Sequence, residues 1–221
     1  MLKFSTSEEN YIKAIYHLQE GESTVTTNAL AQELRTRPAS VTDMMKKLKT
    51  KKLLHYQPYQ GFRLSPEGSK VALGIIRRHR LWEFFLAEKL EFSWEEVHEV
   101  AEDLEHVGSK KLIDRLDAFL GFPRFDPHGD PIPDSNGKMK PSQQISLSEV
   151  ALNRTVIVRH VADQSAGLLE LLRHKKISIG TRMEVKKRFA YDQSVEIRIK
   201  PHPLFTISEQ SAKNIFVSYG E

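Results

Sequence analysis

Residues 26–64, TTNALAQELRTRPASVTDMMKKLKTKKLLHYQPYQGFRL, contain the pattern that decides the fold of the N-terminal part of the chain. Apolar residues spaced three and four apart predict a short helix over 26–34 and a second helix over 39–49. The apolar run after Lys52 and its return over 62–64, across a turn with proline and glycine, predict a β-hairpin. Two helices joined by a tight turn and followed by a hairpin are typical of a winged helix-turn-helix domain.

The residues before this stretch predict one more helix. Ser7 has the side chain of an N-cap, and apolar residues recur with helical spacing over 11–18. Three helices and a hairpin complete a winged-helix domain, which we place at residues 1–64.

The residues after the hairpin predict a helical domain over 65–121. Ser65 followed by proline is a strong helix start, and this helix is expected to run to about Lys89. The capping box Ser-Trp-Glu-Glu at 93–96 opens the next helix, and another is expected over 110–120.

The C-terminal part predicts a linker and a small β domain. Seven proline and glycine residues between 122 and 144 exclude regular structure, so a linker is expected over 122–149. Several short apolar or alternating runs within 150–221, such as 194–200, predict a β-barrel of SH3-like type. The expected fold class is mainly α with a small β part: a winged helix-turn-helix, a helical metal-binding and dimerisation domain, and an SH3-like barrel.

The composition narrows the classes of function. The chain has 221 residues, 39% of them hydrophobic and 28% charged, which fits a globular protein. The absence of cysteine excludes disulfides, cysteine zinc fingers and thiol catalysis, and leaves any metal to His, Asp, Glu and amide ligands. The sequence has no apolar segment near its N-terminus and no apolar run long enough to span a membrane. We therefore expect a cytoplasmic protein without a membrane partner.

The charge is distributed unevenly. Residues 1–64 carry a net charge of +4, and residues 81–106 carry −8. The basic N-terminal part predicts a polyanion as its partner, and the compact acidic segment predicts a bound cation.

Residues 98–106, HEVAEDLEH, are the candidate cation site. On a helix, His98, Glu102, Glu105 and His106 would lie within an arc of about 100° and share one face. Two imidazoles and two carboxylates are ligands for a divalent transition metal, although a solvated charged face is the usual meaning of such a pattern. His79 and Glu83, one helical turn apart, could supply a second pair of ligands.

The candidate DNA-contacting residues lie at the predicted recognition helix. The N-terminal end of such a helix approaches base edges in the major groove, and lysines near it can neutralise phosphates. A lysine-rich solvated face is the alternative for the lysines alone. The candidates are Thr27, Arg37, Ser40, Thr42, Lys46 and Lys47.

In combination, these features resemble the diphtheria-toxin-repressor family of metal-dependent repressors, and more closely its manganese-responsive branch. The resemblance spans nearly all of the chain. It rests on Tyr11-Ile-Lys-Ala-Ile-Tyr16, Ser40-Val-Thr42, Arg77-Arg-His-Arg-Leu81, Glu102-x-x-Glu105-His106, Leu120-Gly-Phe-Pro123 and Pro127-His-Gly-Asp-Pro-Ile-Pro133, followed by the SH3-like domain.

The resemblance implies a regulatory metal site made of Glu102, Glu105, His106 and a ligand from the first helix. That ligand position is Asn10 here, where other members have aspartate or methionine. Glu102 is the hard oxygen donor of the manganese-responsive branch, whereas iron-responsive members have cysteine. Lys13 stands where some manganese regulators have a glutamate ligand.

The resemblance also implies a second metal site. It would use His79, Glu83 and His98 from the helical domain. Asp126, His128 and Asp163 match the positions at which related repressors add a cysteine, a histidine and an acidic residue of the SH3-like domain.

The implied function is a homodimeric transcriptional repressor that binds a palindromic double-stranded operator. Its co-repressor is expected to be Mn(II), with Fe(II) as the alternative and other divalent metals able to substitute in vitro, and no organic cofactor is expected. It would control genes of metal-ion homeostasis, chiefly uptake, and would not be an enzyme.

Two alternatives stay open from the residues. One is a carboxylate-bridged dimetal enzyme, because Glu95-x-x-His98 and Asp103-x-x-His106 are similar to the Glu-x-x-His pairs of helical di-iron bundles, although both lie on one predicted helix. The other is a winged-helix regulator that senses a non-metal ligand.

Overall fold

The structure is a computed structural model. It describes residues 4–19, 24–57, 61–94, 96–139 and 144–219. The chain separates into two compact units, which we describe individually. The first unit consists of residues 1–79, 102–118 and 133–139, and the second of residues 80–101, 119–132 and 140–221.

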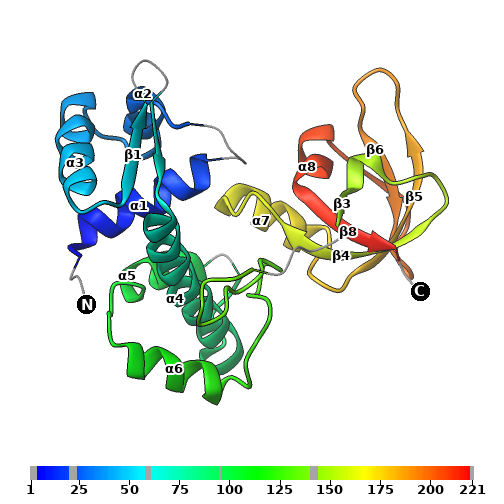
Figure 1. Ribbon diagram of the computed structural model, residues 1–221. Helices are drawn as coiled ribbons and strands as arrows, with labels where there is room; N and C mark the ends of the chain where they lie inside the picture. Colours follow the sequence, from blue (N-terminus) through cyan, green and yellow to red (C-terminus); the bar gives the residue numbers. More distant parts are fainter. Residues whose placement is uncertain (1–3, 20–23, 58–60, 95, 140–143, 220–221) are drawn as a thin grey trace. The chain divides into compact units, whose positions relative to one another are not determined.

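The first unit begins with a winged helix-turn-helix, as the sequence predicted (Figure 1). Its elements are α1 (Thr6–Leu18), α2 (Thr27–Glu33), α3 (Pro38–Thr50), β1 (Leu54–Gln57) and β2 (Gly61–Leu64). The two strands are antiparallel, with Leu54 opposite Leu64. Helix α1 starts two residues earlier than we expected, because Ser5 and Glu8 form a capping box and Ser5, not Ser7, is the N-cap.

Helix α1 packs against the other two helices of the winged helix-turn-helix. Ile12 and Ile15 are fully buried together with Leu30 and Leu48 of the other two helices. Glu8 is also buried, and its carboxylate accepts a 2.6 Å bond from Lys51 just after α3. Burial alone would raise the pKa of Glu8, but the hydrogen bonds from Lys51 and from the Ser5 N–H lower it to about 2. The ion pair therefore fixes α1 to the end of α3.

Three more helices follow: α4 (Pro66–Leu90), α5 (Val97–Leu104) and α6 (Lys110–Phe119). The N–H of Gly68 donates to the Ser65 side chain, which caps α4 as predicted. Helix α5 ends at Leu104, so Glu105 and His106 lie in the turn after it. The predicted continuous helix, on which both would share one face with His98 and Glu102, is therefore wrong at its end. No described helix is both long enough and apolar enough to span a membrane.

The second unit is built around a six-stranded antiparallel sheet with the order β3-β8-β4-β5-β6-β7 (Figure 1). Its core contains the inward side chains of the strands and Leu169 and Leu172 of α7. This domain confirms the predicted SH3-like part of the fold. Its elements are β3 (Ile145–Ser146), β4 (Thr155–Val161), α7 (Ala166–His174), β5 (Arg182–Arg188), β6 (Val195–Arg198), β7 (Phe205–Ile207), α8 (Glu209–Asn214) and β8 (Ile215–Tyr219).

The stretch that we predicted as a linker has more structure than its composition indicates. Strand β3 and a short 3-10 helix, Leu147–Glu149, lie at its end and belong to the β domain. Near its start, the N–H of Val161 in β4 donates to the carbonyl of His128 at 3.0 Å. Gly129 has a φ of +86°, and a Cβ there would lie 1.8 Å from the carbonyl oxygen of Arg159. The loop around His128 is therefore packed tightly on β4.

The close contact at Gly129 gives a test of this packing. Gly129→Ala should destabilise the protein by roughly 3 kcal/mol or more, because strain at a positive φ is added to a clash with backbone. Gly121→Ala is the matched control: its φ is +75°, but no atom lies within 4 Å of the added Cβ. It should cost only about 1 kcal/mol. Denaturant unfolding measures both, and equal losses would show that the loop does not contact β4 in solution.

Candidate metal centre

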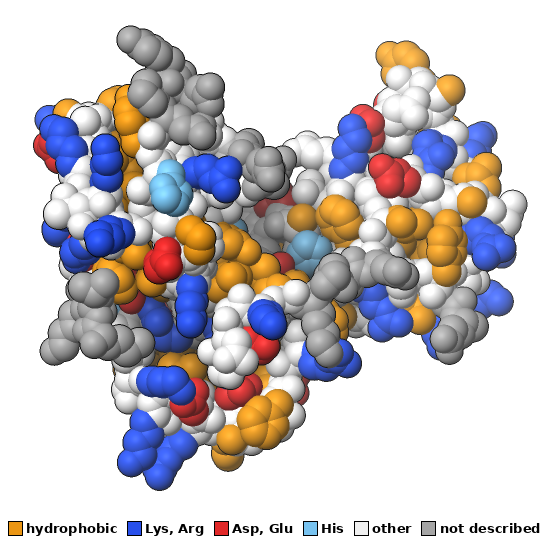
Figure 2. All heavy atoms as spheres, in the orientation of Figure 1, with side chains coloured by type: hydrophobic (Ala, Val, Ile, Leu, Met, Phe, Trp, Pro, Cys, Tyr) orange, Lys and Arg blue, Asp and Glu red, His pale blue; other side chains and the backbone are white. Residues whose placement is uncertain are grey.

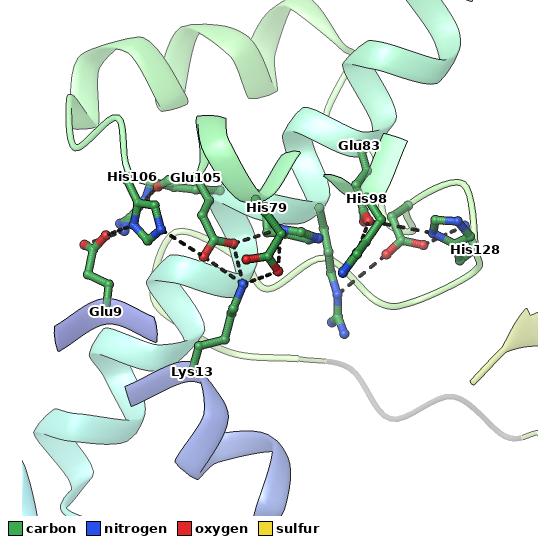
Figure 3. A network of polar contacts seen from close by, with 12 residues as sticks. Glu9, Lys13, His79, Glu83, His98, Glu105, His106 and His128 are labelled. Carbon is green, nitrogen blue, oxygen red and sulfur yellow. Dashed lines mark hydrogen bonds and ion pairs between the residues drawn. The ribbon is translucent and has the colours of Figure 1, made fainter. Parts of the chain in front are cut away.

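The first unit gathers one imidazole and two carboxylates into a cluster. His79 on α4, Glu102 on α5 and Glu105 in the following turn each offer a ligand atom, and these atoms lie within 4.8 Å of one another. Glu105 is fully buried, and His79 Nδ1 lies 2.8 Å from its carboxylate (Figure 3). Burial would raise the pKa of Glu105, but the hydrogen bond with His79 and the ammonium of Lys13 outweigh it and lower the pKa.

Helix α1 reaches this cluster through two charged residues. Glu9 bonds to His106 Nδ1 at 2.6 Å and to Arg78 at 2.7 Å. Lys13 donates to Glu102 at 2.6 Å and to the two oxygens of Glu105 at 2.7 and 2.9 Å (Figure 3). The cluster thus joins the winged helix-turn-helix to the end of α5.

Sequence reasoning did not single out Glu9, which bonds to His106 beside the predicted site. The acidic side chain beside Asn10 was the available signal, because a carboxylate is a stronger partner for a histidine than an amide is. Asn10 itself makes no hydrogen bond through Oδ1, although that oxygen is buried.

The second unit contains another cluster. Glu83 on α4 lies with Asp126 and His128 of the loop, and their ligand atoms are within 4.8 Å of one another. All three residues are buried. His98 Nδ1 lies 3.2 Å from Glu83.

His128 has one ring nitrogen that is oriented toward this cluster. Its Nε2 lies 3.1 Å from the carbonyl of Trp94, which makes Nε2 the protonated donor, and the two rings stack at 5.5 Å. Its Nδ1 then has a lone pair, which is buried without a hydrogen bond 3.9 Å from Glu83. Burial lowers the pKa of His128, so the neutral ring that a metal ligand needs is favoured.

Asp126 is also incompletely bonded. Its Oδ1 accepts the N–H groups of His128 and Asp130, whereas its Oδ2 is buried without a hydrogen bond, 3.6 Å from Arg80. Burial, together with the nearby carboxylates of Asp130 and Glu83, raises the pKa of Asp126 well above its ordinary value. A cation beside Oδ2 would remove this penalty.

Asp130 has the opposite environment. It bonds to Arg80 at 3.0 Å and to Gln164 at 2.8 Å, and His160 lies 3.3 Å away. Burial would raise its pKa, but the hydrogen bond with His160 and the charge of Arg80 lower it. Asp130 therefore fixes the loop instead of offering a free ligand atom.

Asp163 is not part of either cluster in the described structure. Its carboxylate accepts the N–H of Ser165 at 2.9 Å, just before α7. The carboxylate and imidazole groups brought together in the second unit are those of Glu83, His98, Asp126 and His128.

Unbonded buried atoms test whether these residues fit a cation. Among the described residues, seven buried side-chain nitrogen or oxygen atoms have no hydrogen-bond partner. Three of them are Asn10 Oδ1, Asp126 Oδ2 and His128 Nδ1, and each is a lone-pair donor of the kind that a divalent metal binds. Asp126 Oδ2 and His128 Nδ1 both belong to the second cluster, whose donor set therefore fits a metal.

The candidate DNA-contacting residues lie on or beside α3. Arg37, Ser40, Thr42, Lys46 and Lys47 are exposed, and Thr27 is half-buried. Thr27, Thr42 and Lys46 line one hollow together with Tyr56 of the hairpin. Figure 2 shows Lys and Arg side chains on the part of the surface where Figure 1 draws α3.

Three family models match the chain. Residues 3–62 match "Iron dependent repressor, N-terminal DNA binding domain", residues 65–134 match "Iron dependent repressor, metal binding and dimerisation domain", and residues 145–219 match "FeoA domain".

Curated relatives and solved structures agree with these matches. The HTH-type transcriptional regulator MntR of Oceanobacillus iheyensis is 35% identical over 120 residues, which cover 54% of this chain and 81% of that protein. The iron-dependent repressor IdeR of Mycobacterium leprae is 32% identical over 125 residues, which cover 57% and 54%. A manganese-dependent transcriptional repressor in complex with manganese is similar with a TM-score of 0.85 at 31% identity, over 96% of this chain and 99% of that one. ScaR with bound Zn²⁺ gives a TM-score of 0.79 at 30% identity, over 96% and 99%.

The raised pKa of Asp126 predicts the effect of its substitution. In the metal-free folded protein Asp126 binds its proton more tightly than in the unfolded chain. The free energy of unfolding therefore falls as the pH rises above the pKa that Asp126 has in the unfolded chain. Asp126→Asn should therefore raise the melting temperature in chelator at neutral pH by about 2–4 °C, the effect of roughly 1 kcal/mol in a chain of this size. The gain should shrink toward about pH 4.

Asp192→Asn is the control for this experiment. The hydrogen bonds from Ser194 lower the pKa of Asp192, so its substitution should destabilise the protein at neutral pH. Thermal melts in chelator between about pH 4 and pH 8 compare the two variants. A lower melting temperature for Asp126→Asn at neutral pH would contradict the assignment.

Proposed function

The chain belongs to the diphtheria-toxin-repressor family of metal-dependent transcriptional repressors, in its manganese-responsive branch, and we propose that it is a homodimeric repressor whose co-repressor is Mn(II). Fe(II) is the alternative co-repressor, because the relatives include both MntR and IdeR proteins. The genes that it controls would then be those of metal uptake.

Two sets of residues are proposed to hold metal. In the first unit these are Asn10, His79, Glu102, Glu105 and His106, and in the second unit Glu83, His98, Asp126 and His128. His79, which the sequence analysis assigned to the second site, is assigned to the first set because its Nδ1 lies 2.8 Å from Glu105. Carboxylate and amide oxygens predominate, and the chain has no thiol, so the donors are hard and suit manganese. A bound divalent ion would supply the positive charge that the buried carboxylates require.

The observation that carries the proposal is the double role of α1. Through Glu8 it is bonded to Lys51 at the end of the recognition helix α3. Through Glu9 and Lys13 it is bonded to His106, Glu102 and Glu105. The position of α1 therefore depends on the charge balance of the cluster, and the position of α3 depends on α1.

DNA recognition is assigned to the exposed residues around α3. Arg37, Ser40 and Thr42 lie at its N-terminal end, which is the part of a recognition helix that approaches base edges. Lys46 and Lys47 are placed to neutralise phosphates, and Thr27 lies beside them. A dimer holds two such helices at a fixed spacing, so it matches a palindromic operator.

Metal-dependent DNA binding tests the proposal. A duplex selected from random DNA in the presence of MnCl₂ serves as operator. Its affinity for the protein should be roughly tenfold or more higher with Mn(II) than with chelator. Glu105→Ala and His79→Ala should lose most of this response, because each removes a buried ligand and the hydrogen bond between the two.

Glu99→Ala is the matched control, since Glu99 is an exposed glutamate of the same helix α5. It should respond to Mn(II) like the wild type. Operator affinity that is unchanged by manganese, iron, zinc and chelator would refute metal dependence. A metal response that survives both alanine substitutions would instead refute the assignment of the first cluster.

A further inference from the structure

Lys13 lies where the first cluster would hold its cation. Its ammonium is within 2.9 Å of three carboxylate oxygens, one of Glu102 and two of Glu105. The Lys13 side chain is only 14% exposed, and that of Glu105 is 0% exposed. A monovalent cation supplied by the chain itself is therefore bonded to two of the three groups that could ligate a metal.

The formal charges of the cluster show the consequence. Glu9, Glu102 and Glu105 contribute three negative charges, and Lys13 and Arg78 contribute two positive ones, so the net charge is −1 with the histidines neutral. Without Lys13 it would be −2, the charge that one divalent ion neutralises. A divalent ion that enters beside the ammonium meets a like charge within a few ångströms, and one that replaces it must displace three short bonds.

We propose that Lys13 is a built-in competitor of the metal: its ammonium neutralises Glu102 and Glu105 in the metal-free protein, and it weakens divalent binding at the first cluster. The inference rests on the proposed function. It means that Lys13, a single residue of α1, sets the metal concentration at which the repressor responds.

The same bonds have a second effect on α1. Lys13 lies one turn after Glu9, and both residues hold α1 against the cluster without any metal. The metal-free protein consequently retains part of the arrangement that DNA binding requires. A ligand can shift an equilibrium only by its differential affinity for the two states, so this retained part reduces the effect of metal on operator affinity.

The test compares Lys13→Ala with the wild type. Alanine has high helix propensity and no ligand atom, so any gain in metal affinity comes from removal of the ammonium. Calorimetric titration with MnCl₂ alone measures the affinity, and the binding event that disappears in Glu105→Ala identifies the first cluster. Lys13→Ala should bind Mn(II) at that cluster roughly tenfold or more tightly.

Two further measurements follow the metal-free state. In chelator, Lys13→Ala should melt at a lower temperature than the wild type, because Glu102 and Glu105 lose their counter-ion. Its metal-free operator affinity should fall by about fivefold or more, so the ratio between metal-bound and metal-free affinities widens.

The controls separate charge from a general loss of structure. Lys13→Arg keeps the positive charge and should retain an Mn(II) affinity near that of the wild type. Lys110→Ala removes a lysine whose bond to Asp114 is exposed, and it should change none of the three quantities. If Lys13→Ala does not fold in chelator, Lys13→Leu, which retains an apolar stem, takes its place in the same comparison.

The Mn(II) affinity decides the outcome. If removal of the ammonium leaves the affinity of the Glu105-dependent site within about twofold of the wild type, or lowers it, Lys13 is not a competitor, whatever happens to the melting temperature. If no Mn(II) binding depends on Glu105, the proposed function fails first. The two failures are thus distinguishable.

Discussion

The buried carboxylate of Glu105 is the constraint on which the first unit depends. A charge that is withdrawn from water is tolerated only when it is paired and hydrogen-bonded, and Glu105 has both His79 and Lys13 as partners. The bond to Lys13 comes from α1, so satisfaction of one carboxylate requires a particular position of the DNA-binding helices. A cationic partner is required at this place, and in our proposal the exchange of the ammonium for a divalent metal makes the cluster a regulatory element.

Helix α1 is the element proposed to transmit that choice, because its charged residues bond to different partners. Glu8 is bonded to Lys51 after the recognition helix, whereas Glu9 and Lys13 are bonded to the turn that follows α5. Ile12 and Ile15 of the same helix are buried in the apolar core. A rigid helix with a packed apolar side cannot satisfy one set of ion pairs without positioning the other.

The second unit uses two neighbouring aspartates for different purposes. Asp130 has cationic and amide partners that hold the loop to the β domain, and its pKa is lowered. Asp126 lies deeper, with an unbonded oxygen and a raised pKa, next to the unbonded nitrogen of His128. The fixed loop thus presents two incompletely bonded ligand atoms to Glu83, which is the property expected of a cation site.

The sequence by itself determined the helices before residue 121 apart from their exact ends, the hairpin and the β domain, because periodicity, capping residues and turn residues act over a few positions; it missed α8. It did not determine that α5 ends before Glu105, that Glu9 bonds to His106, or that the loop around His128 packs on β4. Nor did it show that Lys13 bonds to carboxylates 89 and 92 positions away. Only tertiary structure decides such pairings, because a buried charge takes its partner from whichever segment the packing brings within hydrogen-bond distance.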